Sequence, residues 1–86
     1  MSDQKHILMV ATQKKIEALR MASGLTLLDD VVTIAALGKL PAGAEAAEQL
    51  EALEFADVPI AELDMAEDAM THLARQIIDS DVVYFV

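Results

Sequence analysis

Residues 5–12 read KHILMVAT, and this apolar run of strand length decides the fold. A strand with one face in water alternates apolar and polar side chains, whereas residues 7–11 are apolar without interruption. The run therefore predicts a strand buried on both faces, which is typical of parallel sheets covered by helices on both sides. Residues 31–37, which read VVTIAAL, repeat the pattern and predict a second buried strand.

The segments between these runs have the spacing of amphipathic helices. Residues 13–28 carry apolar side chains at roughly helical intervals, and residues 44–55 place four glutamates opposite small apolar residues. Gly24 falls inside the first of these helices, where it indicates either close packing on the sheet or a helix that ends early. We favour close packing.

The rest of the chain predicts a weaker strand, a third helix and a last strand. Residues 57–63 contain Pro59, which cannot donate to a strand ladder and so favours a peripheral position. Asp64 and Glu67 have the spacing of a capping box, which predicts the start of the third helix. Residues 82–86 read VVYFV and predict the last strand.

The predicted order is βαβαβαβ in a single domain, residues 1–86. Buried strands joined by helices favour parallel pairing through right-handed crossovers. We therefore expect an α/β fold, a three-layer α/β/α sandwich with a mainly parallel sheet of four to five strands.

Size and charge limit the classes of partner. The chain has 86 residues and a net charge of −9. So small a domain gains from a subunit that covers apolar surface, so we expect a homo-oligomer, or a hetero-oligomer with related subunits. The negative charge repels nucleic acid, and no apolar run approaches the ~20 residues that span a membrane. Residues 1–5 lack the pattern of a secretory signal, so we expect a cytoplasmic protein.

The sequence contains no cysteine, which excludes disulfides, thiolate metal sites and cysteine nucleophiles within these residues. His6 and His72 are far apart in sequence and do not form a recognisable metal motif. His72, with Asp68 and Arg75 nearby on a helix, fits either a tuned acid/base or an exposed helix contact, and we favour the second. We therefore predict no catalytic residue, metal or cofactor.

The candidate ligand site is Thr12, Gln13, Lys14 and Lys15, directly after the first strand. Ligands of open α/β sheets gather beyond the carboxyl ends of the strands. Two lysines at a helix N-terminus oppose the helix dipole, so they fit either an anion site or a solvated helix start. No glycine-rich nucleotide motif accompanies them.

Two stretches together resemble the DsrE/DsrF/DsrH-like family, whose members include subunits of sulfur-relay complexes. The first covers residues 7–12, 18–25 and 30–38, and the second covers residues 77–85. The resemblance implies a parallel sheet of five strands or slightly fewer, assembly into oligomers and, in some members, a cysteine that carries persulfide sulfur.

Without a cysteine, no catalytic residue of that family is carried over to this chain. The resemblance then implies a noncatalytic subunit or scaffold that acts through homo- or hetero-oligomer assembly, with a link to sulfur metabolism. The alternative is a small-ligand module that binds an anion in the first strand-to-helix loop.

Overall fold

The computed structural model describes residues 4–27, 30–63 and 67–86. The strands are β1 (His6–Ala11), β2 (Val31–Leu37), β3 (Ile60–Leu63) and β4 (Val82–Phe85), and the helices are α1 (Lys15–Leu25), α2 (Ala44–Phe55) and α3 (Glu67–Asp79). All strand pairs are parallel, in the order β3-β2-β1-β4. The predicted α/β fold and βαβαβαβ order are confirmed, with four strands in the sheet that the structure describes.

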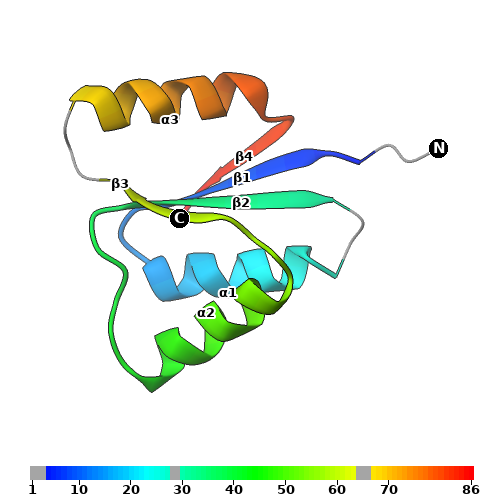
Figure 1. The fold of residues 1–86 in the computed structure, drawn as a ribbon, viewed down its shortest axis with the longest axis vertical. Coiled ribbons are helices and arrows are strands. Elements are labelled where there is room, and N and C mark those ends of the chain that lie inside the picture. Colours follow the sequence, from blue (N-terminus) through cyan, green and yellow to red (C-terminus); the bar gives the residue numbers. More distant parts are fainter. Residues whose placement is uncertain (1–3, 28–29, 64–66) are drawn as a thin grey trace.

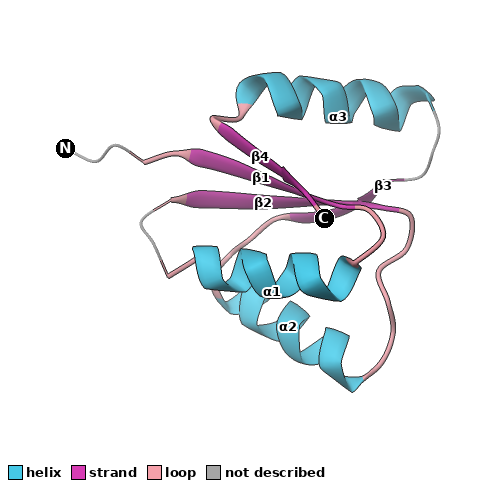
Figure 2. Ribbon diagram, turned by 180° about the vertical axis from the view of Figure 1, so that it is seen from behind, coloured by secondary structure: helices cyan, strands magenta, loops and turns pink. Residues whose placement is uncertain are grey.

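The helices cover both faces of the sheet. Helices α1 and α2 lie on one side and α3 on the other, as both views show (Figure 1, Figure 2). The chain steps from β1 to β2 to β3 in one direction, and right-handed crossovers keep α1 and α2 on the same face. It then returns past β1 to form β4, which puts α3 on the opposite face. The strand order therefore reverses between β1 and β4.

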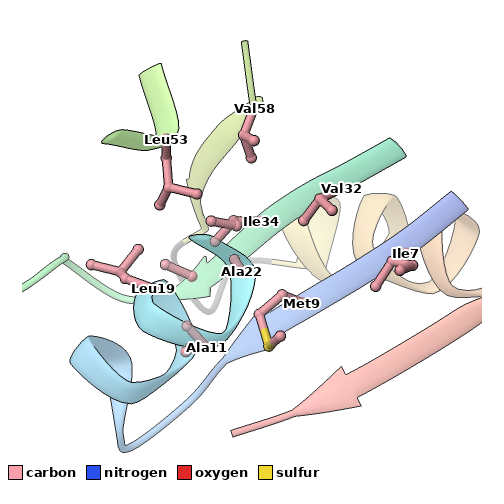
Figure 3. Close-up of a cluster of buried hydrophobic side chains, with 11 residues drawn as sticks. Ile7, Met9, Ala11, Leu19, Ala22, Val32, Ile34, Leu53 and Val58 are labelled. Atoms are coloured by element: carbon pink, nitrogen blue, oxygen red, sulfur yellow. The ribbon is translucent and has the colours of Figure 1, made fainter. Parts of the chain in front are cut away.

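Strand β1 supplies side chains to two hydrophobic clusters, one on each face of the sheet. Ile7, Met9 and Ala11 pack in the cluster under α1 and α2, whereas Leu8 and Val10 pack in the cluster under α3. The larger cluster is drawn in Figure 3, where β1 and β2 contribute from the sheet and Leu19, Ala22 and Leu53 contribute from the helices. An uninterrupted apolar run fits this position because successive strand side chains point to opposite faces.

The end of α1 corrects one expectation. Gly24 lies in the last turn of α1, and a Cβ added to it would meet nothing within 4 Å, so the interpretation of close packing was wrong. The alternative, a helix that ends early, describes the structure, because α1 ends at Leu25 with Thr26 as its C-cap. The predicted end at residue 28 and the predicted cap Asp64 lie outside the described residues.

Helix α2 ends in a Schellman motif. The Asp57 N–H donates to the Glu54 carbonyl at 3.0 Å, and the Val58 N–H donates to the Leu53 carbonyl at 3.0 Å. Asp57 takes a φ of 58°, a conformation that favours glycine. Leu53 and Val58 both lie in the larger hydrophobic cluster, so the motif turns the chain directly from α2 into the core and towards β3.

Candidate functional site

The loop after β1 is bound to the carboxyl end of β4. The Thr12 N–H and hydroxyl both donate to the Val86 carbonyl, at 3.0 and 2.7 Å. The Lys15 ammonium donates to the Thr12 carbonyl at 2.6 Å. Thr12 therefore fixes the course of the loop through its own hydrogen bonds, and the residues that follow it are left to face solvent.

The start of α1 presents positive charge. Lys14 is the N-cap residue, and no side chain caps the helix by a hydrogen bond. The exposed Gln13 and Lys14 precede the first helical residue, Lys15. The free N–H groups of a first helical turn carry a partial positive charge, so the two lysines add to a field that attracts anions.

A cleft of about 460 Å³ lies at this loop, between the chain segments that follow β1 and β2. Its lining residues are Gln13, Lys14, Lys15, Ile16, Glu17, Lys39 and Pro41. Lys39 comes from the loop after β2, which reaches the cleft because β1 and β2 are parallel neighbours whose carboxyl ends share one edge of the sheet. Three of the six lysines and arginines of the chain therefore line one cleft.

The structure thus brings three of the four predicted site residues, Gln13, Lys14 and Lys15, to the cleft, and gives Thr12 a supporting position beneath them. Sequence reasoning missed Lys39. The available signal was its place directly after Gly38, at the carboxyl end of a predicted strand, where ligands of α/β sheets gather.

One carboxylate also lines the cleft. Glu17 accepts a hydrogen bond from Arg20 at 2.7 Å, and Arg20 also pairs with Glu45 of α2. Both partners of the Arg20–Glu17 pair are about half exposed, so the pair is weak, but it offsets part of the charge of Glu17.

A larger cleft, of about 530 Å³, lies along β3 and has a different character. Its charged lining residues are the carboxylates Glu54, Asp57 and Glu62. Glu62 accepts a hydrogen bond from the Leu40 N–H at 2.6 Å. Among the described residues, no group of three histidine, aspartate or glutamate side chains is arranged to hold a metal ion. This cleft repels anions and offers no cation cage, so the smaller cleft is the better candidate site.

The histidines lie away from the smaller cleft. His72 and Asp68 are exposed on α3. His6 is exposed at the amino end of β1, whereas the cleft lies beyond the carboxyl end of that strand. Within the described ranges, no helix has the length and apolar character needed to cross a membrane.

Comparison of the chain with protein-family models, with curated proteins and with solved structures finds no match in any of the three. The resemblance to the DsrE/DsrF/DsrH-like family therefore stays a prediction.

Proposed function

We propose that this domain binds a small anion at the carboxyl edge of its sheet, in the cleft lined by Lys14, Lys15 and Lys39. The observation that carries the proposal is the position of Lys39, which comes from a different loop yet lines the same cleft. A solvated helix start accounts for Lys14 and Lys15 but not for a third lysine from the loop after β2.

The electrostatics of the chain sharpen this argument. A net charge of −9 repels anions at long range, so binding depends on a local positive field. That field comes from the positive charges of the three lysines that line the cleft and from the first turn of α1. A cleft of about 460 Å³ is within the roughly 300–1,000 Å³ typical of small-molecule sites, so the proposal includes anions that carry an organic group as well as inorganic phosphate.

Calorimetry with phosphate, a mononucleotide and sulfur oxyanions tests the proposal. A lysine ammonium close to an anion contributes ~1 kcal/mol or more, so Lys14→Ala and Lys39→Ala should each weaken binding roughly fivefold to tenfold. Lys5→Ala is the matched control, because it removes the same charge at the amino end of β1. That end is about 20 Å from the carboxyl end, at ~3.3 Å per residue over the six residues of β1.

Two results would count against anion binding. The first is that none of these anions binds the parent protein. The second is that Lys39→Ala and Lys5→Ala weaken binding to the same extent, which would mean that net charge alone is responsible.

The second candidate function is the one that the family resemblance implies, a noncatalytic subunit or scaffold that acts by homo- or hetero-oligomer assembly, with a link to sulfur metabolism. The observation that favours assembly is that strand β4, at the edge of the sheet, carries the exposed aromatic side chains Tyr84 and Phe85, and that Ile78 is exposed at the end of α3 just before it. Sedimentation velocity over a range of concentrations tests it, and a monomer throughout, with no copurifying subunit, would contradict it.

A further inference from the structure

Strand β4 has one open edge. It pairs with β1 on one side, and no described strand pairs with it on the other. The Val86 N–H donates to the Val10 carbonyl and the Val86 carbonyl accepts from the Thr12 N–H, so Val86 directs both backbone groups to β1. Backbone groups alternate in direction along a strand, so Val83 and Phe85 direct their N–H and C=O groups to the open edge.

This edge is apolar and lacks the usual protection of a sheet edge. Phe85 is 62% exposed, Tyr84 is 38% exposed, and Ile78, in the last turn of α3 just before β4, is 81% exposed. Residues 82–86 carry no charge. Natural proteins guard edges with charges and prolines.

The outer strand on the other side of the sheet, β3, can be compared with β4. Strand β3 follows Pro59 directly and carries the exposed Glu62, so both protective features are present there. The two edges of one sheet thus differ in character, and only the edge at β4 is suited to pairing with another strand.

We propose that β4 pairs antiparallel with β4 of a second copy of this chain, so that two four-stranded sheets join into one. The proposal rests on the second candidate function, assembly, and names its surface and partner. The two-fold axis passes beside Tyr84. Val83 then lies opposite Phe85 of the second copy, and these residues exchange backbone hydrogen bonds on both sides of the axis. The two Tyr84 side chains face each other as the central pair.

Charge favours the antiparallel arrangement. A parallel pair would set Asp81 beside Asp81 of the second copy. The antiparallel pair instead places Asp79 and Asp81 of the two copies at opposite ends of the paired strands, so these like charges are kept apart.

The available area predicts a reversible dimer. From their exposed fractions, and taking ~200 Å² for a full aromatic side chain, Tyr84 and Phe85 offer about 200 Å² per copy. Ile78 and the backbone of β4 add to this area. A standard stable interface takes about 800 Å² from each partner, so the interface is small and should dissociate on dilution.

Cysteine crosslinking tests the register directly, because the chain has no cysteine of its own. Residues opposite each other in a non-hydrogen-bonded pair have Cα atoms about 4.5 Å apart, within the range that a disulfide spans. Tyr84→Cys should therefore form a disulfide-linked dimer under mild oxidation. Phe55→Cys, at the 89% exposed end of α2, is the control and should remain monomeric.

Sedimentation separates the possible outcomes. The parent protein should move from its monomer mass of 9.3 kDa towards twice that mass as concentration rises. Phe85→Lys should abolish this shift, whereas Phe55→Lys should not. If the Phe85→Lys variant still dimerises, pairing through β4 is wrong, although the protein assembles by another surface. The same conclusion follows if Tyr84→Cys crosslinks no faster than Phe55→Cys. A monomer at every concentration overturns both β4 pairing and assembly.

Discussion

Replacement of Asp57 by alanine should destabilise the protein, whereas glycine should leave its stability nearly unchanged, because the structure holds this aspartate in a left-handed conformation. Its φ of 58° costs most L-residues roughly 1–2 kcal/mol, and aspartate less because it tolerates the region. Glycine avoids this cost but loses more conformational entropy on folding, by roughly 0.5–1 kcal/mol. The exposed side chain of Asp57 adds little packing, so for Asp57→Gly the two terms nearly cancel, to within about 0.5 kcal/mol, whereas Asp57→Ala should lose about 1 kcal/mol.

Thermal and urea unfolding followed by far-UV circular dichroism measures these differences, since the chain contains no tryptophan. In a domain of this size, 1 kcal/mol shifts Tm by roughly 4–8 °C. Asp57 also lines the acidic cleft with Glu54 and Glu62, so Asp57→Asn is the control that removes the charge and keeps the tolerance for the left-handed region. If Asp57→Ala proves as stable as Asp57→Asn, backbone conformation does not govern stability at this position and the reasoning fails.

Three further predictions follow from the helices and the cleft. Gly24→Ala should stabilise the protein by about 0.5–1 kcal/mol, because alanine favours the helix over glycine and its Cβ meets nothing within 4 Å. Unfolding in urea measures the change, and a loss of stability would contradict the prediction. Leu53→Ala should destabilise it by roughly 2–5 kcal/mol, since Leu53 is fully buried, and a fall in Tm of less than a few degrees would show that α2 packs loosely. Glu17→Gln should strengthen anion binding about twofold to fivefold in calorimetry, because a carboxylate lining the cleft opposes an anion; unchanged affinity would place the anion elsewhere.

The fold was largely predictable because the apolar runs are unambiguous. Strand β2 and helix α2 have the predicted bounds, and both are delimited by glycines, Gly38 and Gly43, whose φ values of 90° and 114° suit turns. The end of α1 was less predictable. A glycine within a helical pattern is compatible with close packing and with a helix end, and only the empty space around Gly24 distinguishes them.

The candidate site was only partly predictable, because its composition depends on the order of strands in the sheet. Gln13, Lys14 and Lys15 are consecutive, so their proximity was certain from the sequence. Lys39 joins them because β1 and β2 are parallel neighbours. The supporting role of Thr12 depends on its bonds to Val86, 74 residues away, which no local pattern reveals.

The distribution of charge is the strongest argument that the lysines at the cleft bind a ligand and do more than keep the protein in solution. Fifteen acidic residues outnumber six lysines and arginines, so each cation has many carboxylates available as partners. Arg20 behaves as expected, since it pairs with two glutamates. The Lys15 ammonium instead donates to a backbone carbonyl, and Glu17, the carboxylate that lines the cleft, is engaged by Arg20. Half of the lysines and arginines thus line one cleft beside a helix N-terminus, where the lining carboxylate Glu17 is already paired, and an anion is the ligand that such a field favours.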